Sequence, residues 1–311
     1  STQGYSSAAS DVYKRQAQKH AIRDIVNVIN AGCKSPDQAV WAVEGDIQGC
    51  FDNISHRILL QKVWRMGIHD KRVLKIISQM LKAGYIEQDL YHQTATGTPQ
   101  GGILSPLLSN IYLNDFDWYV GRTYMEPHRK CKHKCNDTRR LKWAGTTPKY
   151  NFRYADDWVV LTSTEKEAFR MKRELTKYFR QKLKLELSQE KTYVTDLRKG
   201  GIHFLGYIVK AERKRKTPNP ATWTEHLVGK PLPDMERLSK KIGSLLEQVH
   251  RIELYSKPNT QAAQIQYVNS IILGLAQYYQ PSICSHAYHA IDRRVNLSLI
   301  HISEPTRLGM I

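Results

Sequence analysis

The chain has 311 residues, of which 41% are hydrophobic, so it can bury a sizeable core in one large domain or two. Its formal net charge of +18 favours a polyanionic partner, and nucleic acid is the first choice. No apolar run reaches the ~18 residues of a membrane span, and the five cysteines fit a reducing cytoplasm better than a disulfide framework, so no membrane partner is expected.

The two ends of the chain, residues 1–16 and 297–311, show no core pattern and no motif. Both are similar to in-frame translations of the adapters used in sequencing libraries. We therefore expect them to be non-native tails and exclude them from the prediction of the fold. The native segment is then expected to be the part between residues 17 and 296.

The first native segment alternates between helical and extended patterns. Apolar residues recur at helical spacing over residues 20–30, and residues 39–46 form an apolar strand that ends on Asp46. Residues 57–83 have helical spacing again, and Gly67 divides them into two helices. Residues 85–96 are short, alternating and polar, which predicts a hairpin.

A loop and a helix follow. Residues 97–102, with the sequence Gly-Thr-Pro-Gln-Gly-Gly, form a loop by their glycine and proline content. The glycines allow a ligand to approach the backbone closely. Ser105 and Pro106 then start a helix, with Ser105 as the cap and Pro106 in the first turn.

Residues 121–151 are dense in arginine and lysine, so they cannot bury much surface. They are predicted to be a loop or short helices that lie on RNA, where each phosphate contact adds salt-dependent affinity. Zinc is an alternative, and its candidate ligands are His128, Cys131, His133 and Cys135. Their spacing is tighter and less regular than in zinc fingers, so a solvated insertion is the default.

The central stretch of the chain is Tyr154-Ala155-Asp156-Asp157, which an apolar run follows directly. Because adjacent residues of a strand point to opposite faces, a tight hairpin can present one or both carboxylates at a sheet edge. Two uncompensated carboxylates repel each other, and a divalent cation such as Mg²⁺ removes the repulsion. A lone Asp-Asp pair is more often a surface turn, so the interpretation depends on the other motifs.

The remainder of the chain changes from strands to helices. Residues 165–185 are predicted to form an amphipathic helix, residues 187–195 a strand that carries Lys191, and residues 201–210 a pair of strands. Residues 211–233 are basic and rich in proline and threonine, which indicates a linker. Helical patterns then cover residues 235–254 and 260–279, and a third begins at residue 285.

Five blocks in this order resemble the palm of a reverse transcriptase. They are Trp41–Ile54, Gly97–Leu108, Arg153–Asp157, Leu187–Thr192 and Phe204–Tyr207. The sequence Gly-Thr-Pro-Gln-Gly-Gly-Ile-Leu-Ser-Pro-Leu-Leu-Ser-Asn-Ile-Tyr-Leu is especially similar to the group II intron-encoded reverse transcriptase (maturase) family. The resemblance covers roughly residues 17–296.

The resemblance implies an α+β fold, a right-hand polymerase with an antiparallel palm sheet packed on helices and a helical thumb, called domain X. Residues 17–40 would be the remnant of the fingers. Residues 41–212 would form the palm and fingers, with the basic insertion at 121–151. A linker at 213–233 would lead to a partial thumb at 234–296.

The resemblance also implies RNA-directed DNA synthesis with two Mg²⁺ ions, for which Mn²⁺ could substitute. The implied metal ligands are Asp46, the Ile47 carbonyl, Asp156 and Asp157. Lys191 is a candidate general acid for the pyrophosphate leaving group, with a solvated lysine as the alternative. The implied nucleotide and template contacts are Ile47, Phe51, Gln100, Gly101, Arg153 and Tyr154. The implied primer grip is Phe204, Leu205, Gly206 and Tyr207.

The expected partners are intron RNA, an RNA template with a DNA primer, deoxynucleoside triphosphates and target DNA. The expected location is the bacterial cytoplasm, in a ribonucleoprotein with intron RNA, and dimerisation stays open. One alternative is a reverse transcriptase of another lineage, such as a retron, diversity-generating or CRISPR-associated enzyme. The others are a splicing maturase that binds RNA with an idle polymerase site, and a fragment that is inactive alone.

Overall fold

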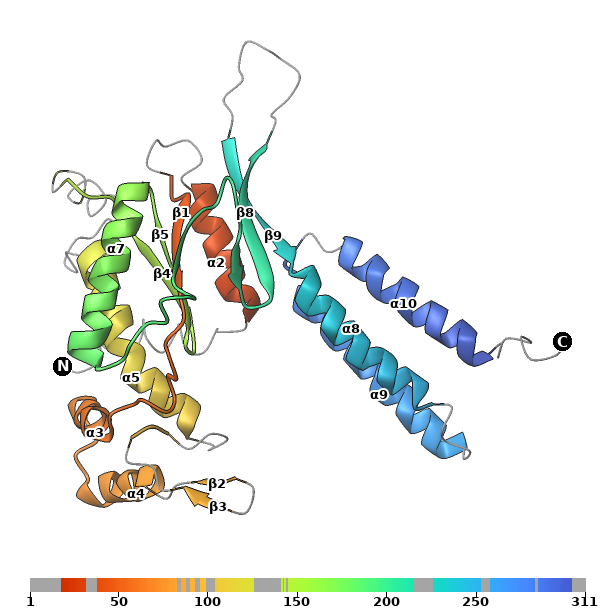
Figure 1. Cartoon of the computed structure of the whole chain (residues 1–311), viewed down its shortest axis with the longest axis horizontal. Helices are drawn as coiled ribbons and strands as arrows, with labels where there is room; N and C mark the ends of the chain where they lie inside the picture. The colour runs from red at the N-terminus through yellow and green to blue at the C-terminus, as the bar shows by residue number, and fades with distance from the viewer. Residues whose placement is uncertain are drawn as a thin grey trace, which may run out of the picture. The chain divides into compact units, whose positions relative to one another are not determined.

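The structure is a computed structural model that describes residues 18–31, 38–82, 85–87, 90–92, 96–98, 104–125, 141, 143, 145–214, 226–252, 258–282 and 285–303 (Figure 1). The chain divides into two compact units, one of residues 28–200 and the other of residues 1–27 together with 201–311. Helix α2 (Gln18–Ala31) runs across the boundary between their sequences. Among the described helices, none combines the length and the apolar character that crossing a membrane requires.

A four-stranded antiparallel sheet forms the centre of the first unit. Its strand order is β4-β5-β1-β6, with β1 at Trp41–Gly45, β4 at Tyr150–Tyr154, β5 at Asp157–Thr162 and β6 at Tyr193–Asp196. Gly45 pairs with Trp158, and Tyr154 pairs with Asp157. The end of β1 and the turn between β4 and β5 therefore lie at the same end of the sheet.

Helices α5 (Ser105–Val120) and α7 (Glu165–Tyr178) pack on one face of this sheet (Figure 1). Val43 and Val160, which are paired across β1 and β5, share a buried core with both helices. The Phe116 ring of α5 lies 5.6 Å from the Trp158 ring between centroids. Because strand residues alternate between faces, Glu44 and Val159 belong to the opposite face of the sheet.

The remaining elements of the first unit follow the predicted order. Helices α3 (His56–Arg65) and α4 (Lys71–Lys82) are separated at Gly67, whose φ of +103° suits glycine, so the predicted break is confirmed. A short hairpin of β2 (Tyr85–Glu87) and β3 (Leu90–His92) is also confirmed. A π-helical turn η1 (Gly121–Met125) extends α5, and a second one, η2 (Phe179–Leu183), extends α7.

The predicted cap of α5 is wrong by one residue. Ser105 is the first helical residue, and Leu104 occupies the cap position without a side-chain hydrogen bond. Pro106 lies in the first turn, as expected, because its missing N–H is not needed there. Ser105 is buried, so its side chain belongs to the interior rather than to an exposed helix end.

The second unit combines a three-stranded sheet with helices. The sheet has the order β7-β8-β9, with β7 at Ile202–Phe204, β8 at Tyr207–Lys214 and β9 at His226–Pro233. The helices are α8 (Met235–His250), α9 (Pro258–Tyr279) and α10 (Ser285–Ser303). Mixed α and β structure with antiparallel sheets is confirmed for the chain.

The predicted linker at 213–233 is wrong over its second half. Strand β9 pairs with β8 over the eight positions from Tyr207↔Pro233 to Lys214↔His226. Proline is tolerated in an edge strand because the N–H it lacks can face away from the sheet, and β9 is such an edge. Pro231 and Pro233 therefore gave a misleading signal against a strand.

Candidate active site

Acidic residues gather at the end of the sheet where β1 stops and the β4–β5 turn begins. Asp46 follows Gly45 and Asp157 precedes Trp158, and because Gly45 and Trp158 are paired, the antiparallel register places the two carboxylates side by side. Asp156 lies in the adjoining turn. The register thus brings Asp46 to the same end of the sheet as the distant Asp156–Asp157 pair.

The turn that carries Asp156 has an unusual backbone. Ala155 has a φ of 55°, a conformation that residues with a side chain seldom adopt and that persists only when the surroundings enforce it. The Arg153 guanidinium supplies that enforcement, because its Nη1 donates to the Ala155 carbonyl at 2.7 Å and to Asn110 Oδ1 at 2.8 Å. Its Nε and Nη2 donate to Asp117, with an Nη2–Oδ2 distance of 2.6 Å. Helix α5, which carries Asn110 and Asp117, therefore braces the turn.

The expected contact between Arg153 and a nucleotide stays a prediction, because the guanidinium is engaged within the protein. The Arg153 side chain is only 9% exposed, and all three of its nitrogen atoms are already hydrogen bonded. Asn110 and Asp117 were missed by the sequence prediction. The one indication of their role in the sequence is that they are seven positions apart, which puts two polar residues on one face of an apolar helix. Tyr154 pairs with Asp157 and is partly exposed, so its predicted role is untouched by this result.

Lys191 lies against the acidic edge. Its Nζ is 3.0 Å from Asp46 Oδ2, and this hydrogen bond, together with the Asp46 charge, raises the pKa of Lys191. Asp157 adds to the same electrostatic attraction. Lys191 was expected on a strand, but it lies in the turn before β6, which lets its side chain reach across to the end of β1.

The donor set suits a hard divalent cation. A cationic ammonium already occupies the outer side of the Asp46 carboxylate, which is 29% exposed. Within the described ranges, no three His, Cys, Asp or Glu side chains form a metal-binding group by themselves. Mg²⁺ does not need such a cage, because it commonly takes one or two carboxylates and completes its shell with phosphate and water. The residues present therefore fit Mg²⁺ better than a metal that needs a complete protein site.

The backbone next to Asp46 is fixed by an isolated bridge between Ile47 and Leu187. Ser188 N–H donates to the Asp46 carbonyl at 2.9 Å, and Gln48 N–H donates to the Glu186 carbonyl at 2.9 Å. Neither bond uses the Ile47 carbonyl, which was predicted as a metal ligand. The bridge thus holds this part of the chain in place while leaving that oxygen out of its hydrogen bonds.

Cys50 is buried beneath the acidic edge and was not singled out from the sequence. Burial, and then the negative charge of Asp156, raises the pKa of the Cys50 thiol to about 12. The Arg153 charge lowers the pKa of Cys50 in part, and Asp46 and Asp52 raise it further. The thiol is protonated at neutral pH and offers no thiolate to a metal.

Phe51 lies in a turn that is tied to the glycine-rich loop. Thr98 N–H donates to the Phe51 carbonyl at 2.7 Å, and Gly97 N–H donates to the Ile54 carbonyl at 2.8 Å. The His56 ring lies 2.6 Å from the Gly97 carbonyl, which adds a further contact to the loop. Gln100 and Gly101, the predicted nucleotide contacts, lie outside the described residues, as do His128, Cys131, His133 and Cys135.

The predicted primer grip forms the β7–β8 hairpin of the second unit. Its two turn residues, Leu205 and Gly206, have φ values of 51° and 74°. Tyr278 of α9 donates its hydroxyl to the Leu205 carbonyl at 2.5 Å, and Tyr207 donates to the Tyr278 carbonyl. Asp234 N–H, at the start of α8, donates to the Gly206 carbonyl at 3.1 Å. The hairpin is therefore fastened to both helices.

Comparisons with known proteins agree with this arrangement. Residues 8–209 match the family model described as Reverse transcriptase (RNA-dependent DNA polymerase). Group II intron-encoded protein LtrA of Lactococcus lactis subsp. cremoris is 34% identical over 300 residues, which cover 78% of this chain and 49% of that protein. Protein YkfC of Escherichia coli (strain K12) is 33% identical over 207 residues, covering 63% of this chain and 53% of YkfC. The chain spans about half the length of these two relatives.

Proposed function

This chain belongs to the reverse transcriptase (RNA-dependent DNA polymerase) family, and on that premise we propose that its acidic edge is the site of RNA-templated DNA synthesis. The observation that carries the proposal is the register of β1 and β5, which places Asp46 beside Asp157 with Asp156 in the adjoining turn. Reverse transcriptases generally use divalent metal ions. Asp46, Asp156 and the Ile47 carbonyl would hold Mg²⁺, or Mn²⁺ in its place, and Asp157 would ligate or support them.

When bound, the two ions would activate the primer 3′-hydroxyl and neutralise charge on the triphosphate. The residues of the chain have separate tasks. Arg153 would keep Asp156 in position through the Ala155 carbonyl, because it ties that turn to α5. Lys191 would leave Asp46 when a divalent cation takes the carboxylate, and its Nζ–H would then be free to protonate the pyrophosphate oxygen.

Selection and placement of substrates would fall to the surrounding loops. The Phe51 ring would act as a steric gate that crowds a ribose 2′-hydroxyl, and the hydrogen bonds from Thr98 and Gly97 support its turn. Gln100, Gly101 and Tyr154 would contact the incoming nucleotide and the template base. Phe204–Tyr207 would hold the primer, and helices α8–α10 would form the thumb that holds the template–primer duplex.

The similarity to an intron-encoded protein supports a finer proposal. Because the chain is 34% identical to the Lactococcus protein, the whole protein would copy intron RNA into DNA and assist the splicing and mobility of a group II intron. Its partners would be intron RNA and target DNA, and it would work as a ribonucleoprotein in the bacterial cytoplasm. The second candidate is a maturase that binds intron RNA without polymerase activity.

Primer extension on an RNA template tests the proposal. Asp156→Ala should abolish extension and leave RNA binding intact, because it removes a ligand without changing the basic surface. Glu190→Ala is the matched control, since it removes an exposed acid beside Lys191 and should extend normally. Extension preserved in Asp156→Ala would sink the assignment of the site. Mn²⁺ binding followed by electron paramagnetic resonance should also weaken in Asp156→Ala, which gives a readout that does not need turnover.

A further inference from the structure

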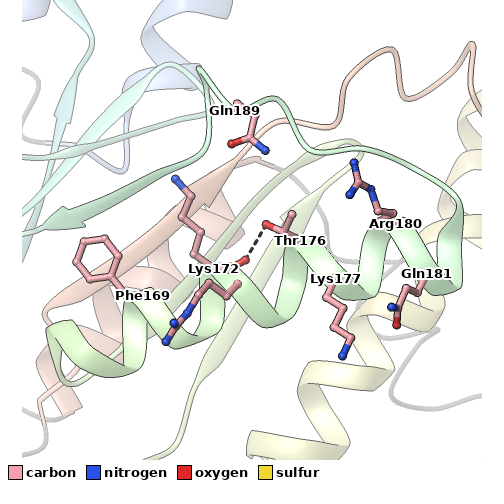
Figure 2. A pocket seen from close by; sticks show the side chains of 8 residues that line it. Phe169, Lys172, Thr176, Lys177, Arg180, Gln181 and Gln189 are labelled. Atoms are coloured by element: carbon pink, nitrogen blue, oxygen red, sulfur yellow. Dashed lines mark hydrogen bonds between the residues drawn. The ribbon is translucent and has the colours of Figure 1, made fainter.

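The outer face of helix α7 lines an open groove of about 760 Å³ in the first unit (Figure 2). Its basic side chains are Lys172, Arg173, Lys177 and Arg180, and no acidic side chain stands among the described residues that line it. These positions are spaced by one, four and three residues, so they fall on a single side of the helix. Figure 2 shows Lys172, Lys177 and Arg180 along α7 and η2, with Gln189 across from them.

Two acids of α7, Glu167 and Glu174, have partners away from the groove. Glu167 accepts hydrogen bonds from the Thr147 N–H at 3.0 Å and from the Thr146 hydroxyl at 3.3 Å. Glu174 accepts from the Tyr124 hydroxyl and pairs with Arg170 at 3.7 Å. Neither Glu167 nor Glu174 lines the groove, and the charged side chains among its described lining residues are all cations.

The cations of the groove are poorly neutralised. Arg180 pairs with Glu186 at 3.1 Å, but their side chains are 73% and 61% exposed, and such a pair contributes little. Lys172 donates to the Thr192 carbonyl at 2.6 Å and meets no opposite charge there. Arg173 and Lys177 form no ion pair within the part of the chain that the structure describes. The groove thus presents concentrated positive charge to solvent.

This groove is separate from the acidic edge. The inner side of α7 packs through Met171 and Leu175 into the core that contains Val160. Asp157, in contrast, is an odd-numbered position of β5 and lies on the alternate side of the strand from Val160. The groove and Asp157 therefore lie on opposite faces of the sheet, although the turn that carries Lys191 adjoins the groove through Gln189 and Thr192. A ligand in the groove contacts a different surface from a ligand at the acids.

The geometry points to the ligand class, and we propose that the groove binds the phosphate backbone of RNA outside the reaction site. Lys172 and Arg180 are eight residues apart, which is about 12 Å along a helix and matches three to four phosphates of one duplex strand. Phe169, which is 50% exposed at the groove, offers a ring on which a base can stack. A lipid surface or a protein partner would favour a larger apolar area than this single ring.

Binding of a labelled RNA hairpin to the full chain, measured by fluorescence anisotropy over a series of salt concentrations, tests the proposal. The test variant is Arg173→Glu/Lys177→Glu. The matched control is Lys182→Glu/Lys199→Glu, which changes the net charge equally at exposed positions outside the groove. Circular dichroism and thermal unfolding should show that both variants fold like the original chain.

The expected result is an RNA affinity at least tenfold weaker in the groove variant. The slope of log affinity against log salt should also fall by about two, because each replaced cation no longer neutralises a phosphate. The control should keep its slope. Ultraviolet crosslinking should place RNA on the peptide that contains Phe169 in the original chain.

Equal losses in both variants would overturn the proposal, because the effect would then be one of bulk charge. A groove variant that keeps RNA affinity but no longer binds phosphatidylserine vesicles would also overturn it, and would assign the groove to a membrane surface instead.

Discussion

The ammonium of Lys191 lies 3.0 Å from Oδ2 of Asp46, although 145 residues separate them in the sequence. The Lys191 side chain is 69% exposed, so it can leave this carboxylate without disturbing the core. The chain thus supplies its own cation to an acid that was predicted to bind a metal. A lysine in this place competes with any divalent ion for the same oxygen.

Replacing Lys191 should strengthen metal binding and slow DNA synthesis, because its ammonium is proposed both to compete with the metal and to donate a proton. In Lys191→Gln, we expect Mn²⁺ to bind about two- to fivefold more tightly in the absence of nucleotide, because the competing ammonium is gone and exposed pairs are weak. Primer extension should become slower, because the proposed proton donor is lost. Electron paramagnetic resonance measures the first effect and single-turnover kinetics the second. Unchanged Mn²⁺ affinity would contradict the competition, and Lys199→Gln serves as the exposed control.

Removing Arg153 should loosen the turn that holds Asp156. Arg153→Ala removes the guanidinium bonds to the Ala155 carbonyl and to Asp117, which keeps a hydrogen bond from Asn151, so the free energy of unfolding should fall by roughly 2–4 kcal/mol. Arg153→Lys should restore only part of this, because one ammonium cannot reproduce the bidentate contact. Urea unfolding provides the measurement. Full stability in the lysine variant would show that charge alone matters at this position.

A side chain at residue 45 should collide with the indole of Trp158. An alanine Cβ at Gly45 would lie 2.2 Å from Trp158 Cζ2, and the ring is buried and cannot move away freely. Gly45→Ala is therefore expected to cost about 1–3 kcal/mol of stability. The double variant Gly45→Ala/Trp158→Phe should lose less than the sum of its single variants, because the smaller ring leaves room. Additive losses in thermal or urea unfolding would argue against a direct clash.

Lys149 should make stability depend on pH in the alkaline range. It is fully buried, and its Nζ lies 3.6 Å above the centre of the Tyr124 ring without a hydrogen-bond acceptor among the described residues. Burial, and then the charge of Arg170, lowers the pKa of Lys149 from 10.5 to about 8. Below pH 8 the folded state keeps a buried charge, which lowers the free energy of unfolding. This loss of stability disappears as the pH rises from 8 towards 10.5, where the unfolded chain also loses the proton.

Lys149→Met should consequently raise the free energy of unfolding at pH 7 by roughly 1–3 kcal/mol, with the contact to Tyr124 offsetting part of the gain. The difference from the original chain should shrink as the pH approaches 10.5. Chemical unfolding at several pH values measures this, with the exposed Lys182→Met as the control. A destabilised Lys149→Met at pH 7 would show that the cation–ring contact outweighs the cost of burial.

Local patterns sufficed for much of the fold, including the strands that carry Asp46 and Asp157 to one end of the sheet. The apolar run after Asp157 and the strand before Asp46 are each visible within a few residues, and the structure pairs them as β5 and β1. Contacts between distant segments were harder to predict. Nothing near Arg153 in the sequence indicates that Asp117 will occupy its guanidinium, because that choice depends on how α5 packs on the sheet. Lys191 reaches Asp46 only because its turn precedes β6.

The hydrogen bonds between the β7–β8 turn and helix α9 couple the position of the turn to that of the helix. Tyr278 both donates to Leu205 and accepts from Tyr207, and their rings stack with centroids 5.5 Å apart. A twist or a shift of α9 would therefore move Leu205 and Gly206 with it, because these hydrogen bonds connect the turn to the helix. The position of a primer end held by this turn would then follow the position of α9, with Tyr278 as the residue that connects the two.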